Sequence, residues 1–228
     1  AVGYAALGAN TTADNNVAIG SGALLLNTTG TNNTAVGTNA LDAITTGNNS
    51  TAVGYQALTA DTAGLNVGIG YTAGAAITTG TRNTAVGPSA LDVASTGDDN
   101  TAIGANAMGA TTTASDNTAV GSYAMAVNTT GASNVAVGYA ALDANTTGSQ
   151  NVAVGYSALT AATTGNFNIA MGHEAGKLIT TGSNNIAIGQ SALGTNTADN
   201  NTAIGYNAMV ANTTGTNNVA VGYAALDA

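Results

Sequence analysis

Several residue types are missing or scarce in this chain, and each absence excludes a class of function. There is no cysteine, so neither a disulfide framework nor thiolate chemistry is available. The only two basic residues, Arg82 and Lys177, lie far apart, so no basic patch can form to bind the phosphates of a nucleic acid. Charged residues make up 6% of the 228 residues, against about 25% in an ordinary globular domain, and the net charge is -9. This composition is not that of an ordinary enzyme.

Long hydrophobic runs are missing as well. Apolar runs such as Ala23–Leu26 are far shorter than the roughly 20 residues that a membrane-spanning helix requires. No charged segment followed by an apolar stretch opens the chain, so no targeting segment is visible. We therefore expect no membrane insertion by this segment.

The chain consists instead of a short internal repeat, mostly 17 residues long, with the consensus Thr/Val/Ile-Ala-Val/Ile-Gly-Tyr-x-Ala-Leu-x-x-Asn-Thr-Thr-Gly-x-Asn-Asn. We number the positions of the repeat from 1 to 17. The first repeat lacks position 1, and the others begin at Val17, Thr34, Thr51, Val67, Thr84, Thr101, Thr118, Val135, Val152, Ile169, Ile186, Thr202 and Val219. Position 4 is glycine and position 7 is alanine in all 14 repeats, and position 17 is asparagine except at Ser50.

A longer repeat, made of several of these short repeats, is also present. Variant repeats recur in the same order, which divides the array of residues 1–228 into blocks 1–100, 101–185 and 186–228. Duplication of a block is the simplest origin. No polar capping repeat stands at either end, and solenoids need such caps for solubility. We therefore expect the chain to be an excerpt of a longer fibre.

The repeat predicts an all-β fold. Positions 1 to 3, such as Val135–Val137, are β-branched or alanine and end at glycine, which predicts a strand of three to five residues. The Asn-Thr-Thr-Gly-x-Asn-Asn stretch is typical of turns. A unit this short cannot bury its own apolar face, so we expect about 14 stacked coils of a parallel β-solenoid, forming an elongated rod.

Alternation along the strand predicts which side chains face the core. Positions 1 and 3 are expected inside, and the small residues of position 2, such as Ala102 and Ala136, on the opposite face. We interpret this alanine file as the seam with a neighbouring chain. The core of one coil holds only two or three aliphatic side chains, too few to offset its backbone entropy, so we expect a trimer that is unstable as a monomer.

Two details depend on the stacking of the repeats. Where glycine replaces the leucine of position 8, isoleucine appears at position 11, as if to restore lost volume. Arg82 and Asp99 occupy position 16 of consecutive repeats, so a parallel stack predicts a surface ion pair between them. The glycine and isoleucine pairs are Gly74 with Ile77 and Gly176 with Ile179.

Runs such as residues 134–142, Asn-Val-Ala-Val-Gly-Tyr-Ala-Ala-Leu, resemble the head repeats of trimeric autotransporter adhesins of the YadA type. Residues 202–215 are similar to the 17-residue repeats of phage tail-fibre-like proteins. The resemblance covers the whole chain. It implies a left-handed β-roll, a homotrimer, an extracellular location on a cell surface or a virion fibre, and attachment to a host-surface receptor or glycan. It leaves the choice between phage fibre and bacterial adhesin open.

Candidate catalytic and metal-binding residues are few. His173 and Glu174, the only histidine and the only glutamate, are adjacent in an extended chain and so point apart. Zinc would need three or four such ligands. No calcium-loop motif occurs, and Asp98 with Asp99 is the only acidic pair. We expect no enzyme activity, no metal and no cofactor, and we interpret the aspartates as turn residues.

Seven of the eight tyrosines occupy position 5, and six of them fall in consecutive repeats. Stacking would align these six in a ladder. An amphipathic ring offers a glycan both a flat apolar face and a hydroxyl group. The interpretation that we favour is a ladder that stabilises the stack or seals a seam between chains. The six tyrosines are Tyr55, Tyr71, Tyr139, Tyr156, Tyr206 and Tyr223.

The sequence thus predicts a structural and adhesive fibre segment, either the head of a surface adhesin or the shaft of a phage tail fibre. An ice-binding solenoid is the alternative, because threonine recurs at positions 12 and 13. A flat ice-binding array needs two threonine files on one face, two residues apart along a strand. Positions 12 and 13 are adjacent, so only one file is expected to face out, and we predict that ice binding is absent.

Overall fold

The computed structural model describes residues 1–93 and 95–227. Over these residues the fold is all-β, and no helix has the length and apolar character needed to cross a membrane. The chain forms two compact units, Ala1–Ser115 and a second from Asp116 onward. The strands of the first unit are β1 (Val17–Ile19), β2 (Thr34–Val36), β3 (Thr51–Val53), β4 (Val67–Ile69), β5 (Thr84–Val86) and β6 (Thr101–Ile103). Those of the second are β7 (Thr118–Val120), β8 (Val135–Val137), β9 (Val152–Val154), β10 (Ile169–Met171), β11 (Ile186–Ile188), β12 (Thr202–Ile204) and β13 (Val219–Val221).

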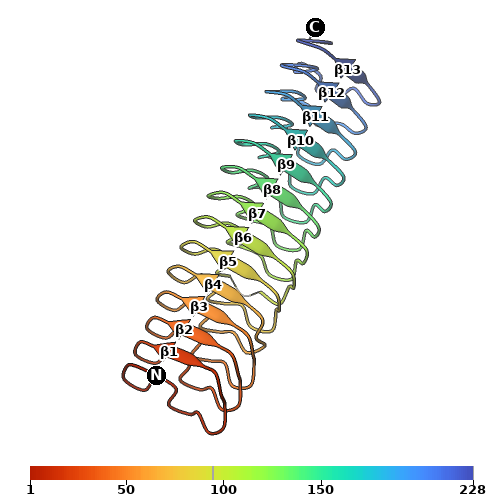
Figure 1. The fold of residues 1–228 in the computed structure, drawn as a ribbon. Helices are drawn as coiled ribbons and strands as arrows, with labels where there is room; N and C mark the ends of the chain where they lie inside the picture. The colour runs from red at the N-terminus through yellow and green to blue at the C-terminus, as the bar shows by residue number, and fades with distance from the viewer. Residues whose placement is uncertain (94, 228) are drawn as a thin grey trace. The chain divides into compact units, whose positions relative to one another are not determined.

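Within each unit the strands pair in parallel, each with the next in sequence (Figure 1). Identical repeat positions face one another: Ala18 pairs with Ala35, and Ala136 with Ala153. The register also holds across the 16-residue repeat of the first unit, where Thr51 pairs with Val67. The predicted parallel β-solenoid with one repeat per coil is therefore confirmed, with strands of three residues.

The surface ion pair predicted from this register is present. Arg82 Nε lies 2.7 Å from Asp99 Oδ1, and Arg82 Nη2 lies 2.7 Å from Asp99 Oδ2. The two residues stand in consecutive coils, so the contact is possible only when coils stack at one repeat per turn. The guanidinium holds the pKa of the Asp99 carboxyl below its ordinary value.

The assignment of inner and outer strand faces from the sequence was wrong. The alanines of position 2, such as Ala102 and Ala136, are buried inside their own coil, and the residues of positions 1 and 3 point outward. The reason is the narrow interior. A Cβ built on Gly68, the glycine at position 2 of β4, would lie 2.7 Å from Leu58 Cγ, so in this coil even the methyl group of alanine would force a neighbour to shift. The alanine file is therefore core and not a seam.

The core of each coil is built from the opposite side. Leucine or methionine at position 8 reaches across to the strand, and alanine at position 7 lies beside it. The volume compensation predicted for two coils is confirmed, because Ile77 and Ile179 are fully buried and each packs over the glycine of its own coil. A Cβ on Gly74 or Gly176 would approach the isoleucine Cδ1 to 3.0 Å.

A ladder of buried asparagines runs along position 17, where the sequence indicated only a turn. Each side-chain amide donates to the carbonyl of the position-14 residue in the next coil, as in Asn151 Nδ2 to Gly165 O at 2.8 Å. Its Oδ1 accepts the backbone N–H of position 17 in that coil, as in Asn168 N to Asn151 Oδ1 at 2.9 Å. The polar groups of the position-17 asparagines, and the backbone groups they bond to, are thus satisfied between coils.

Glycine at position 4 ends every strand with a backbone that other residues rarely adopt. Its φ lies between 122° and 140° from Gly3 to Gly222. The glycines also stack closely: a Cβ on Gly155 would lie 2.5 Å from the carbonyl oxygen of Gly172 in the next coil. Both the dihedral angle and the contact exclude a side chain.

Replacing one of these glycines should therefore be severe. We expect Gly155→Ala to lower the free energy of unfolding by about 3 kcal/mol or more, because it adds positive-φ strain and a backbone clash. Chemical denaturation monitored by circular dichroism measures this loss. The control is Thr130→Ala on an exposed corner, expected within about 0.5 kcal/mol of wild type. Equal effects of the two substitutions would contradict the close stacking of position 4.

Candidate functional site

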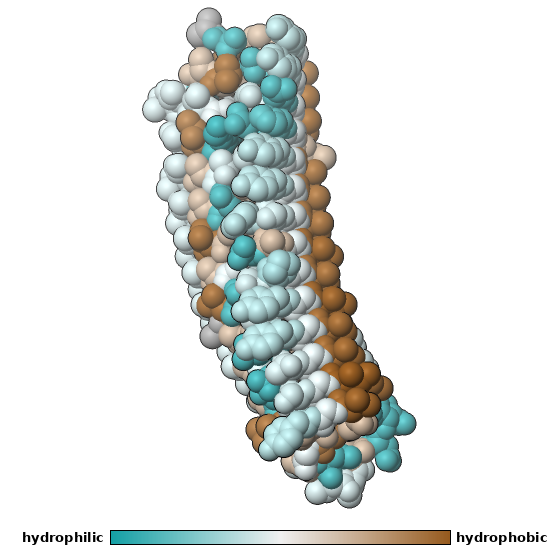
Figure 2. All heavy atoms as spheres, turned by 90° about the vertical axis from the view of Figure 1, so that its left-hand side faces the viewer, coloured by the Kyte–Doolittle hydropathy of each residue, from teal (hydrophilic) through white to brown (hydrophobic). Residues whose placement is uncertain are grey.

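The outer face of the strands carries exposed apolar side chains along each unit. Position 3 carries valine, isoleucine or methionine in every strand, and position 1 carries threonine, valine or isoleucine. Many of these side chains are more than a third exposed, for example Val53, Ile103, Val137, Met171 and Ile204. Figure 2 shows them as a continuous hydrophobic strip along each unit. We call this surface, positions 1 and 3 of strands β1 to β13, the aliphatic face.

The tyrosines of position 5 form a second file, separated from the aliphatic face by the glycines of position 4 (Figure 2). All six predicted ladder tyrosines are exposed, and they stack in three pairs of consecutive coils. The pairs are Tyr55 with Tyr71 (ring centroids 5.5 Å apart, planes at 10°), Tyr139 with Tyr156 (5.3 Å, 13°) and Tyr206 with Tyr223 (5.3 Å, 9°). Ring faces thus lie against neighbouring rings, and the ring edges and hydroxyls point outward.

The structure adds two rings to this file that the sequence argument missed. His173 stacks on Tyr156, with centroids 5.1 Å apart and planes at 9°. Tyr123, at position 6 of its repeat, meets Tyr139 edge to face at 6.1 Å and 72°. Four rings therefore follow one another along the second unit. The signal for His173 was its position, since it occupies the tyrosine site of the repeat.

His173 and Glu174 do not form a dyad. The histidine ring lies in the aromatic file, whereas Glu174 Oε1 accepts a hydrogen bond from Lys177 Nζ at 2.7 Å. That bond, and to a smaller extent the charges of Lys177 and His173, hold the pKa of the Glu174 carboxyl below its ordinary value. The carboxylate is thus committed to an ion pair, and the arrangement has no base aimed at a nucleophile.

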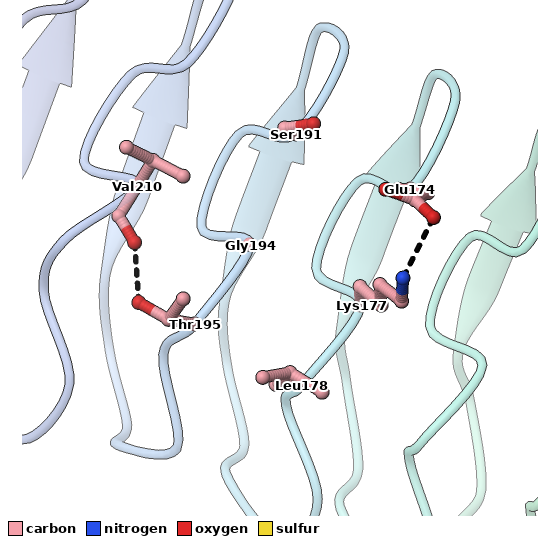
Figure 3. Close-up of a pocket in the computed structure, with 7 residues that line it drawn as sticks. All are labelled: Glu174, Lys177, Leu178, Ser191, Gly194, Thr195 and Val210. Atoms are coloured by element: carbon pink, nitrogen blue, oxygen red, sulfur yellow. Dashed lines mark hydrogen bonds and ion pairs between the residues drawn. The ribbon is translucent and has the colours of Figure 1, made fainter.

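A shallow groove lies beside this ion pair (Figure 3). Three consecutive coils contribute to it, and it opens where Gly194 carries no side chain between Lys177 and Val210. The Thr195 hydroxyl is used internally, donating to the Val210 carbonyl. The residues that line the groove are Glu174, Lys177, Leu178, Ser191, Gly194, Thr195 and Val210. The groove thus has an ion pair at its rim and an apolar floor, and no reactive groups converge in it.

The aspartates mostly serve the turns. Asp98 Oδ1 accepts from the backbone N–H and the hydroxyl of Thr81 in the preceding coil, at 2.7 and 2.8 Å. These bonds lower the pKa of the Asp98 carboxyl, the backbone N–H most strongly. Among residues 1–93 and 95–227, no group of three histidine, cysteine or carboxylate side chains could hold a metal ion.

Asp61 is the exception, because its carboxylate is buried. Its Oδ2 accepts from Ser50 Oγ at 3.0 Å, and its Oδ1 accepts from the backbone N–H groups of Ala63 and Gly64 at 3.1 Å. Burial outweighs these hydrogen bonds and raises the pKa of the Asp61 carboxyl. Ser50 is the one residue that replaces asparagine at position 17. The unusual serine and the buried aspartate are therefore hydrogen-bond partners. The sequence shows both but not their contact.

The threonine files differ from the sequence expectation. Positions 12 and 13 both reach the surface, because the chain turns a corner there between the buried positions 11 and 14. The prediction that only one file faces out was wrong, since it assumed an extended strand. The position-12 hydroxyls are nevertheless used within the stack, as in Thr146 Oγ1 to Thr163 O at 3.0 Å.

Comparison of the chain with protein-family models, with curated proteins and with solved structures finds no match in any of the three.

The buried Asp61 carboxylate gives a pH-dependent prediction. A carboxyl with a raised pKa in the folded state favours folding when protonated, so its contribution is lost as the pH rises from its ordinary pKa through the raised value. We expect Asp61→Asn to be more stable than wild type at pH 7, by about 1 kcal/mol or more. The advantage should shrink towards about pH 4. Urea unfolding of both proteins between about pH 4 and pH 7 measures this difference in the free energy of unfolding.

Asp98→Asn is the matched control, because its carboxyl has a lowered pKa and so stabilises the fold in its charged form. We expect this variant to lose stability at neutral pH relative to wild type. An Asp61→Asn variant that is less stable than wild type at pH 7 would contradict the assignment of a destabilising buried charge.

Proposed function

We propose that this chain is a structural and adhesive fibre segment, the head of a surface adhesin or the shaft of a tail fibre, located outside the cell and assembled as a homotrimer. The aliphatic face is the observation that carries the proposal. It runs along every described strand and has nothing covering it within the chain. Exposed apolar patches of this extent mark association surfaces. The repeated outer surface then presents the same groups many times to a host receptor.

The occupant that the aliphatic face favours is a second copy of the same chain. No strand carries a charged residue, so two copies can approach here although each has a net charge of -9. Side chains also recur along the face at the spacing of stacked strands, about 4.8 Å. Another copy has this same period, so its side chains can fill the gaps between successive coils along the full length of the face.

The size of the face suits more than one partner. Three residues of strand span about 10 Å, and each coil adds about 4.8 Å, so the faces of the two units together offer roughly 600 Å². A standard interface buries about 800 Å² on each partner. A single pairwise contact would therefore be at the weak end, and we propose that three copies converge on their aliphatic faces, so that each copy contacts two others.

Lysine substitution on the aliphatic face tests assembly without disturbing the coil interior. We expect Ile103→Lys with Val137→Lys to convert trimers to monomers, because each new charge would be buried between copies while pointing away from its own core. Sedimentation equilibrium measures the mass, and circular dichroism checks the fold. The control, Thr130→Lys, places the charge on an exposed corner and should stay trimeric.

Substitutions at Ala102 and Ala136 do not serve this purpose, because both side chains lie inside the coil and a glutamate there would unfold the chain in any oligomeric state. A wild-type mass equal to one chain, with unfolding independent of protein concentration, would overturn the trimer.

Ice binding is the second candidate, since both threonine files reach the surface. We expect it to be absent because the two files flank a corner and do not form a flat array, and because position-12 hydroxyls already bond to the next coil. Thermal hysteresis of the wild-type chain, compared with a generic protein at equal concentration, measures it. Hysteresis well above that control would favour the ice-binding function over the fibre.

A further inference from the structure

We propose that the stacked tyrosine pairs are sites of oxidative cross-linking, at which a dityrosine bond joins neighbouring coils of one chain. The pairs are Tyr55 with Tyr71, Tyr139 with Tyr156, and Tyr206 with Tyr223. The proposal concerns contacts within one chain, so it stands or falls independently of the trimer and of any receptor.

The geometry of the pairs favours coupling. Ring centroids are 5.3 to 5.5 Å apart and the planes lie within 13° of parallel, so the two rings of each pair stack with their faces toward each other. The backbone holds both residues at the same repeat position in consecutive coils, which fixes their proximity. Coupling therefore needs only a rotation of the side chains, and no movement of the coils.

The rings are also accessible to an oxidant. Tyr71 is 59% exposed, Tyr139 49% and Tyr156 51%. Neither cysteine nor tryptophan is present to compete for one-electron oxidation, and oxidation of the four methionines by peroxide adds oxygen, a mass change distinct from coupling. With ring faces turned to each other and edges to the solvent, the hydroxyl and the ortho carbons beside it are the parts that a reagent meets first.

The required co-reactant is a one-electron oxidant, such as a haem peroxidase supplied with hydrogen peroxide. Each phenol loses one electron and one proton, and the two phenoxyl radicals join through their ortho carbons. The ortho hydrogens then return to the oxygens, restoring both phenols. Overall the pair loses two hydrogens, one new carbon–carbon bond forms, and one peroxide is reduced to two waters.

The consequence is a covalent tie between coils otherwise held by hydrogen bonds and packing. Each bond closes a loop of one repeat and restricts the unfolded chain, as a disulfide does in secreted proteins. This chain has no cysteine with which to make such a tie. Oxidation should therefore raise the temperature at which the chain unfolds.

The sequence allows a sharp test, because trypsin has only two cleavage sites. Cleavage after Arg82 and Lys177 gives three fragments, each of which contains one stacked pair. The full chain is treated at low concentration with a haem peroxidase and hydrogen peroxide, then digested and weighed. We expect every fragment to lose the mass of two hydrogens, with dityrosine fluorescence and no covalent dimers on a denaturing gel.

Tyrosine-to-phenylalanine variants identify the partners, since phenylalanine keeps the stacked ring and removes only the hydroxyl. Tyr139→Phe should abolish the mass loss in the middle fragment, residues 83–177, and leave the outer two unchanged. The matched control is Tyr123→Phe in the same fragment. Because Tyr123 meets Tyr139 edge to face, we expect this control to couple as wild type.

Three results would overturn the proposal. The first is an unchanged mass loss in the middle fragment of Tyr139→Phe, and the second is loss of coupling in Tyr123→Phe. The third is oxidation that yields cross-links mainly between chains, seen as covalent dimers at low concentration. If the unfolding temperature does not rise in the cross-linked chain, the cross-link does not stabilise the fold as proposed.

Discussion

The close stacking of glycine on glycine at position 4 is the constraint on which the rest of the structure depends. A Cβ on Gly155 would come within 2.5 Å of the carbonyl oxygen of Gly172 in the next coil, so not even alanine fits there. Nothing but glycine allows the positive φ together with this approach. With the strand ends fixed in this way, every other position must lie over its counterpart, which creates the asparagine ladder, the alanine file and the tyrosine stacks.

This arrangement places the polar and apolar groups in an unusual order. The interior holds alanine, one leucine or methionine per coil, and asparagines whose amides bond between coils. Larger aliphatic side chains lie on the outer face of the strands because the interior is too narrow for them. A coil that must leave its β-branched residues outside gains by covering them with another copy, since apolar burial is the dominant favourable term in association. The shape of the interior thus motivates the proposed trimer.

A few residues that differ from the repeat consensus make individual coils distinct from the others. Ser50 and Asp61 exchange a pair of neutral groups for a hydroxyl bonded to a buried carboxylate. The only lysine, glutamate and histidine gather in one coil, and two of them form an ion pair at the rim of a groove. Because charged residues are few, such places distinguish one stretch of the array from another.

The sequence by itself determined the repeat length, the presence of one short strand per repeat, the parallel register and the Arg82 to Asp99 ion pair, because stacking of identical units leaves no freedom in which residues meet. It also predicted the replacement of leucine by isoleucine around Gly74. These inferences needed only periodicity and volume.

Only the tertiary structure decided which strand face is inside, because alternation defines two faces without saying which is buried. Packing of Leu58 against the small residue of position 2 settles the matter. The structure likewise shows that the position-17 asparagines, which the sequence indicated as turn residues, form a buried ladder. It also shows that His173 stacks on Tyr156. Those contacts depend on the width of the coil and on ring orientation. Both are set by the path of the chain around the coil, which no linear pattern specifies.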